Sequence, residues 1–266
     1  MSTVALARPR RRLTQTRVVK SEWIKFWSLR STVATLAIAA GLLIGIGLLA
    51  SSLFTGEPST APGPGAAADP VSASLAGTTF AQLAFGTLGV LLMAGEYGTG
   101  MIRSSIAAVP KRLPVLWAKI IVFTGVAFVV ALAAAAIAFT GGQALIGDGG
   151  AAWTDPGVAR AVIGTAVVLA GSGVLGLGLG ALLRSTPTAI TALFGVLFLL
   201  PGVATLLLPD SWGTAVAYLP SNAATAFTAI TRAAGTLAPR AGLAVFLGYV
   251  VAAVAAAAVR LKRSDV

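Results

Sequence analysis

The side chains best able to hold a partner protein gather in one short segment between two apolar runs. This segment contains Glu96, Tyr97, Gly98, Thr99, Arg103, Lys111 and Arg112. Its carboxylate and its cations can form charge-assisted hydrogen bonds with a docked protein. Gly98 and Gly100 allow the backbone to turn sharply out of an apolar run. Composition alone fits two interpretations: a docking segment for a soluble partner, or an ordinary basic connection beside a membrane.

Catalytic chemistry finds little support in the same sequence. The chain has no Cys and no His, which excludes disulfides, thiolate or imidazole metal sites, and triads with an imidazole base. Residues 171–176 spell G-x-G-x-x-G, but this dinucleotide fingerprint lies within a membrane-length apolar run and lacks the later acidic residue. No Lys follows a Gly, so a P-loop is absent from the sequence. We therefore predict no catalytic residue, no cofactor, no metal and no enzymatic activity.

Ion-driven transport is also disfavoured. Such transporters usually bury a carboxylate or an imidazole, because an ionisable group inside a membrane is costly unless it is functional. No Asp, Glu or His lies deep in an apolar run, and Glu96 stands at the end of one. Any energy source is therefore expected on another subunit.

The elements that must position the polar segment are six apolar runs. They cover residues 33–53, 74–95, 116–140, 161–183, 188–208 and 241–259. Each has the roughly 20 residues that a helix needs to cross a bilayer core. With 57% hydrophobic and only 10% charged residues, and a mean hydropathy of +0.91, the chain is not a soluble domain, in which charged residues reach about 25%. The predicted fold class is an all-α polytopic membrane protein with six transmembrane helices.

The basic residues predict the orientation of these runs. All of the 19 Lys and Arg except Arg160, Arg232 and Arg240 lie before the first run, after the last run, or around the second and fourth connections. By the positive-inside rule, both termini are cytoplasmic in a multi-pass protein of the cell (plasma) membrane. The net charge of +11 lies beside apolar spans, where anionic lipid attracts it. Membrane lipid is therefore an expected partner and nucleic acid is not.

The N-terminal region divides into a tail and a helix. Residues 1–14 predict a disordered basic tail, because they offer little to bury. Residues 15–32 alternate apolar and basic side chains at helical spacing, which predicts an amphipathic helix lying flat at the inner surface. Its characteristic residues are Glu22, Trp23, Lys25, Trp27 and Arg30. A transmembrane domain over residues 33–260 and a cytoplasmic tail over 261–266 complete the chain.

Three further patterns concern the spans themselves. Pro201 and Gly202 fall inside the fifth run and predict a hinge or a broken helix. The glycines of the fourth run, including the pair Gly176 and Gly180, predict close helix packing, within the chain or across a dimer. Residues 209–240 are too apolar for a hydrated loop, so we expect short helices that dip into the outer leaflet or cover the bundle.

Two stretches give the sequence a specific likeness. They are residues 21–31, SEWIKFWSLRS, and residues 96–112, which contain EYGTG, IRS and PKR. With the six spans and the missing nucleotide-binding domain, these stretches resemble the permease subunits of ABC-2 type transporters over essentially the whole chain. The resemblance implies an export permease that forms a homodimer or a heterodimer with a related permease and binds separate ABC ATPase subunits.

The same resemblance assigns roles to the two stretches. Residues 22–30 correspond to the interfacial connecting helix, and residues 96–112 include the coupling helix that meets the ATPase. The stretch 218–230 corresponds to the outer re-entrant helices of that family. Two rival functions remain: a non-transporting membrane anchor or immunity protein, and a passive channel. The substrate is not specified, although the scarcity of polar side chains in the spans favours an amphipathic or lipid-like cargo over a small ion.

Overall fold

Six long apolar helices form the body of the protein. The computed structural model describes residues 14–56, 69–101 and 113–263, and within these ranges it contains helices and no strand. The helices long and apolar enough to cross a membrane are α2 (Arg30–Ser52), α4 (Thr78–Gly98), α6 (Leu113–Ile146), α7 (Val158–Leu183), the α8 to α9 stretch (Thr186–Leu207) and α12 (Pro239–Arg263). The predicted all-α, six-span fold class is confirmed, and the chain is a multi-pass membrane protein.

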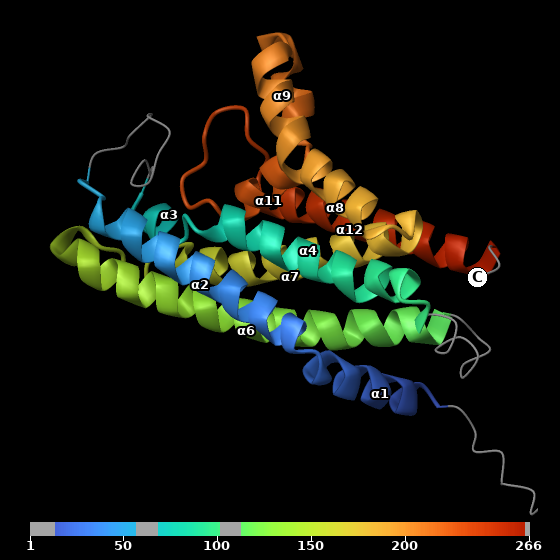
Figure 1. Cartoon of the computed structure of the whole chain (residues 1–266). Coiled ribbons are helices and arrows are strands. Elements are labelled where there is room, and N and C mark those ends of the chain that lie inside the picture. The colour runs from blue at the N-terminus through green and yellow to red at the C-terminus, as the bar shows by residue number, and fades with distance from the viewer. Residues whose placement is uncertain (1–13, 57–68, 102–112, 264–266) are drawn as a thin grey trace, which may run out of the picture.

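The N-terminal helix is separate from the first span. Helix α1 (Gln15–Ser28) ends at Leu29, which has an extended backbone, and α2 begins at Arg30. The predicted single helix over residues 15–32 is therefore two helices, and Arg30 belongs to the span. Figure 1 shows α1 emerging from the bundle at the end where α2 and α6 begin. The predicted tail falls almost wholly on residues 1–13, outside the described residues, and the C-terminal residues 264–266 also lie outside them.

Helix α7 occupies the centre of the bundle, because its glycines let three neighbours approach closely. A Cβ added at Gly176 would lie 2.1 Å from the Gly86 carbonyl oxygen of α4, and one added at Gly173 would lie 2.1 Å from the Phe123 ring of α6. Gly171 meets the ring of Phe246 in α12. The α7 glycines therefore serve close packing within the chain, as the small-residue pattern predicts. The dinucleotide-like sequence is part of this helix.

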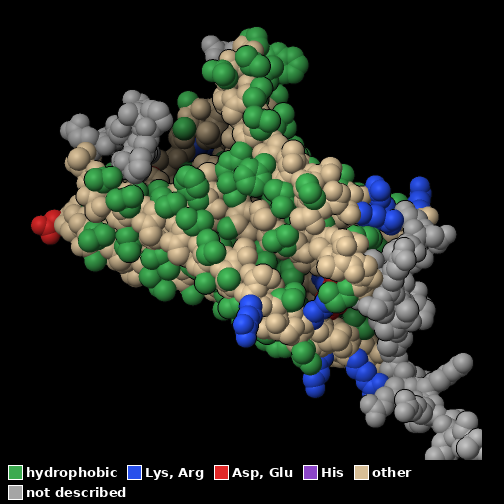
Figure 2. Space-filling view, viewed as in Figure 1, with side chains coloured by type: hydrophobic (Ala, Val, Ile, Leu, Met, Phe, Trp, Pro, Cys, Tyr) green, Lys and Arg blue, Asp and Glu red, His purple; other side chains and the backbone are tan. Residues whose placement is uncertain are grey.

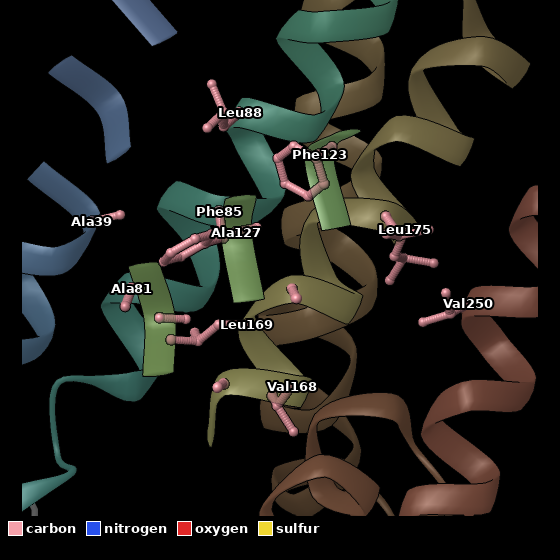
Figure 3. Close-up of a cluster of buried hydrophobic side chains, with 14 of the residues drawn as sticks. Ala39, Ala81, Phe85, Leu88, Phe123, Ala127, Val168, Leu169, Leu175 and Val250 are labelled. Atoms are coloured by element: carbon pink, nitrogen blue, oxygen red, sulfur yellow. The ribbon is translucent and has the colours of Figure 1, made fainter. Parts of the chain in front are cut away.

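The core follows from that packing. Figure 3 shows Phe85, Phe123 and Leu169 converging between α4, α6 and α7, and all three side chains are almost fully buried. Small residues such as Ala81 and Ala127 fill the spaces between these large ones. The centre of a single chain is therefore closely packed and mostly apolar, and Gln82 of α4 donates a buried hydrogen bond to Ser172 of α7 there.

Helix α6 extends beyond the predicted third span. It continues six residues past Thr140, through two glycines to Ile146. Gly142 lies against the hydroxyls of Ser51 and Ser74, where a side chain would not fit. Gln143 then donates hydrogen bonds to the Pro70 carbonyl at 2.9 Å and to the Ser74 hydroxyl at 2.7 Å. These contacts keep the last turn of α6 helical, although glycine has a low intrinsic helix propensity.

The fifth span is interrupted just before the predicted hinge. Helix α8 (Thr186–Phe194) runs into a π-helical stretch, η2 (Gly195–Leu199), and α9 (Leu200–Leu207) follows with Pro201 in its first turn. A π turn accommodates the proline, whose ring and missing N–H do not fit an uninterrupted α-helix. Figure 1 shows α9 bent away from the other spans. A flexible role for Pro201 and Gly202 stays a prediction.

The predicted short helices after this span are present. After η3 (Asp210–Trp212) come α10 (Gly213–Ala217) and α11 (Pro220–Thr228), and α11 packs against α12 and α7. Arg160 of α7 donates hydrogen bonds to the carbonyls of Phe227 and Ala229, the latter at 2.9 Å. These bonds satisfy carbonyls that the end of α11 leaves without helical partners.

The other short elements lie beside the C-terminal ends of α2 and α6. Helix α3 (Pro70–Ser74) is capped by Asp69, whose carboxylate accepts from the backbone N–H of Val71 and Ser72. A short 3-10 turn, η1 (Gly147–Gly149), ends α6. Figure 2 shows Lys and Arg side chains gathered at the end of the bundle near α1 and an acidic side chain at the other end, the distribution from which the orientation was predicted.

Candidate functional site

The face that α1 turns toward the bundle carries both apolar and charged side chains. Val18, Glu22 and Phe26 recur every four residues and are buried, so they form one stripe along the helix. Val18 packs against Val115 and Ala118 at the start of α6. This apolar contact fixes the distance between α1 and α6, and it carries the Glu22 carboxylate into the space between α1 and the spans.

An ion-pair cluster of four side chains fills that space. Lys119 of α6 donates hydrogen bonds to Glu22 of α1 and to Glu96 of α4, each with 2.7 Å between the nitrogen and the oxygen. Lys25 of α1 also pairs with the Oε1 atom of Glu96. Lys119 and Glu96 are each about 95% buried, and Lys25 is the most exposed member. One buried ammonium thus joins three helices, and the four charges sum to zero.

Glu96 is incompletely satisfied. Its Oε1 atom accepts from both lysines, whereas its Oε2 atom is buried and has no hydrogen-bond partner among the described residues. A buried polar atom without a partner costs about 1–3 kcal/mol, and more when it is charged. Such atoms are rare in folded proteins, and one that persists calls for a structural or functional explanation.

Helix α4 ends in a turn shortly after Glu96. Thr99 caps the helix, and its hydroxyl donates to the Gly95 carbonyl at 3.0 Å. Gly100 adopts a φ of +71°, a left-handed conformation that glycine enters at low cost. The sharp turn predicted at this point is therefore present, and Gly100 makes it.

Tyr97 faces a different neighbour. The guanidinium carbon of Arg184 lies 5.2 Å from the centroid of the Tyr97 ring, a cation–π contact. Arg184 ends α7 with a φ of +55°, which directs its side chain back over α4. Adjacent residues of α4 thus bind α1 and α6 through Glu96 and the end of α7 through Tyr97.

A cavity opens beside the ion-pair cluster. Its volume is about 380 Å³, and it lies between α1, α2, α4 and α6. Glu96, Lys25 and Lys119 line its polar side. Leu29, Leu91 and Met101 also line it and are each about 40% exposed. The cavity therefore has a charged inner end and an apolar rim, within the size range of small-molecule sites.

The predicted site residues are only partly brought together. Glu22, Lys25 and Glu96 share the cluster, whereas Trp23 and Trp27 are nearly half exposed and contact each other edge to face. Gly98 and Thr99 are exposed at the end of α4. The remaining predicted residues of the polar segment, Arg103, Lys111 and Arg112, lie outside the described residues.

Sequence reasoning missed the centre of the cluster. Lys119 was counted only as a basic residue near a connection, although it lies inside an apolar run. An ionisable residue within a span is a functional candidate whose partner should be sought. That signal was available for Lys119, and the nearby carboxylates Glu22 and Glu96 were the available partners.

Neither a scan against protein-family models nor a search of curated proteins finds a match to this chain.

Proposed function

We propose that this chain is the membrane-spanning permease subunit of an ABC-2 type exporter in the cell membrane, driven by a separate ABC ATPase subunit. The observation that supports it most is the buried cluster of Glu22, Lys25, Glu96 and Lys119. The chain after α4 and the chain before α6 both belong to the connection that the resemblance assigns to ATPase docking. The cluster ties both ends of this connection to α1.

This arrangement can transmit a movement of the connection to α1. Glu96 lies two residues before the end of α4, and Lys119 lies in the second turn of α6. A force on the connection between them is transmitted to α1 through the 2.7 Å hydrogen bonds of Lys119. Packed helices linked by such pairs switch between discrete arrangements more readily than they deform. ATP binding on the partner subunit would supply the free-energy difference between two arrangements of the spans.

The packing of the core supports a particular place for cargo to pass. Helix α7 and its neighbours form a closely packed and mostly apolar centre, so cargo would pass between two permease copies. In α9, Leu206 and Leu207 are 83% and 73% exposed, and a second copy at this span would complete such a path, as a homodimer or with a related permease.

The test is co-purification with an ABC ATPase encoded beside this chain. Both proteins are co-expressed, the permease is captured in detergent, and bound ATPase and ATP hydrolysis are measured. We expect stoichiometric ATPase, with binding weakened by Arg103→Ala or Lys111→Ala in the docking segment, because each removes a cation from the expected contact.

A matched control separates docking from nonspecific charge effects. Lys262→Ala removes a cation from the far end of α12, where it is exposed, and should leave ATPase binding unchanged. Absence of any bound ATPase with the wild-type chain would overturn the proposal and favour a non-transporting anchor.

A further inference from the structure

The charge that a ligand can reach in the cavity beside the ion-pair cluster is positive. Glu22 and Glu96 line this cavity, but their side chains are only 10% and 5% exposed, and both accept hydrogen bonds from Lys119. Lys25 also lines it and is the most exposed member of the cluster, at 23%. Its ammonium carries three donor protons, and Glu96 is its one partner among the described residues. Lys25 can therefore donate to a further acceptor.

Two hydroxyls in the first turn of α2 add donors to the same wall. Ser31 and Thr32 line the cavity, and neither hydroxyl is hydrogen-bonded to a described residue. Thr32 is only 3% exposed, yet its unpaired oxygen is not fully enclosed, so its remaining surface faces the cavity. Polar groups this deeply buried normally have a partner. An acceptor on a bound ligand would supply one.

Apolar side chains form another part of the wall. Leu88 and Val122 line the cavity and are almost fully buried. Leu91 also lines it and is 41% exposed on the membrane-spanning helix α4, so the cavity borders lipid there. An acyl chain can enter beside Leu91, because the wall behind this residue is apolar.

The surrounding charges favour a ligand with a net negative charge. Helix α1 and the first turn of α2 carry four cations, Arg17, Lys20, Lys25 and Arg30, and the one carboxylate of Glu22. The charges of Lys119 and Glu96 cancel, so an excess of three positive charges remains beside the cavity. An anionic headgroup is attracted by this excess, whereas the cationic part of a zwitterion is repelled.

We infer that this cavity binds an anionic membrane phospholipid. Its phosphate oxygens accept hydrogen bonds from Lys25, Ser31 and Thr32, and one acyl chain lies along Leu91. This inference does not depend on the proposed transport function, because binding needs neither the ATPase nor transport.

The test uses native mass spectrometry of the full chain in detergent. The protein is mixed with equal amounts of phosphatidylglycerol and phosphatidylcholine that carry identical acyl chains. Both contain the phosphate, but only phosphatidylglycerol has a net charge. We expect the wild-type chain to retain phosphatidylglycerol preferentially by about fivefold, the scale of one basic residue near an anionic lipid. Glycerol phosphate, which lacks the acyl chain, should not displace it; displacement would overturn the assignment to a lipid.

Lys25→Met tests the cation in the cavity. Lys20→Met is the matched control, because Lys20 is an exposed lysine of the same helix that does not line the cavity. We expect Lys25→Met to bring the ratio of the two bound lipids close to one, and Lys20→Met to leave it within about twofold of wild type. An equal loss in both variants would show that the preference belongs to the whole basic surface and would overturn the inference.

A second variant covers the case in which Lys25→Met disturbs the ion pairs. Thr32→Val removes one hydroxyl at nearly constant volume, and titration with phosphatidylglycerol should show about fivefold weaker binding, the scale of one hydrogen bond. Thr124→Val is its control, because the Thr124 hydroxyl of α6 is also unpaired but is enclosed and does not line the cavity. Equal retention of the two lipids by the wild-type chain, or unchanged affinity in Thr32→Val, overturns the inference.

Discussion

The Lys119 ammonium of α6 lies 2.7 Å from the Glu22 carboxylate of α1, a residue 97 positions earlier in the chain. Both groups are at least 90% buried. The pair therefore fastens a helix that lies outside the six spans to the third of them.

Loss of this ammonium should destabilise the fold. Lys119→Met removes the shared donor of two buried carboxylates, and breaking a buried pair costs about 3–5 kcal/mol. The free energy of unfolding, measured by denaturant titration in detergent, should fall by that amount. Lys20→Met removes an exposed lysine of α1 and should change little. A similar small change for both variants would contradict the role of the cluster.

A double variant isolates the pair itself. Glu22→Gln combined with Lys119→Met should cost less than the sum of the two single changes, because each single change already removes their interaction. The same titration gives the coupling energy. Simple additivity would mean that the Lys119–Glu22 contact does not contribute to stability.

The contact between α4 and α7 should not tolerate a methyl group. A Cβ at Gly89 would lie 1.9 Å from the Gly173 carbonyl oxygen, so Gly89→Ala must separate the two helices. We expect a loss of at least about 1–3 kcal/mol, the usual cost of overpacking, seen as a lower thermal midpoint. Gly41→Ala is the control, because Gly41 of α2 has nothing within 4 Å and alanine favours helices.

The guanidinium of Arg160 should control opening of α11. Arg160→Ala leaves the Phe227 and Ala229 carbonyls without their donor, a loss of roughly 1–3 kcal/mol. Hydrogen exchange of peptides from α11 should accelerate about tenfold, because exchange follows local opening. Arg240→Ala removes an exposed cation nearby. If both variants exchange alike, Arg160 does not hold this helix.

The orientation can be measured directly because the chain has no cysteine. Single cysteines replace Ser28 and Lys262 at one end, and Asp148 and Ala234 at the other; all four positions are exposed. A membrane-impermeant maleimide added to intact cells should label the latter two, and the former two only after permeabilisation. The reverse pattern would show that the positive-inside rule misassigns this protein.

Hydropathy predicted all six spans because a bilayer demands about 20 apolar residues from each. It misplaced the end of the third span, since Gly142 and Gln143 are held in α6 by contacts with Ser74 that no local pattern contains. It also merged α1 with the start of α2, because the break at Leu29 lies in the backbone and leaves the helical spacing of side chains almost unchanged.

The sequence predicts some residues of the candidate site but not the contacts between them. Glu22, Lys25 and Glu96 stood out as charges beside apolar runs, but their meeting point depends on which helix faces which. Pairing over 97 positions is a property of tertiary packing. The cavity appears only when four helices are placed together.

The central position of α7 also sets an order for biogenesis. Its glycine faces receive α4 and α6, which are synthesised before it, and α12, which is synthesised last. Until the fourth span leaves the ribosome, the surfaces of α4 and α6 that carry Gly89 and Phe123 have no partner to close against. Membrane insertion of α7 is therefore the step at which a loose set of spans becomes a bundle, and quality-control machinery would encounter the earlier spans with those surfaces open.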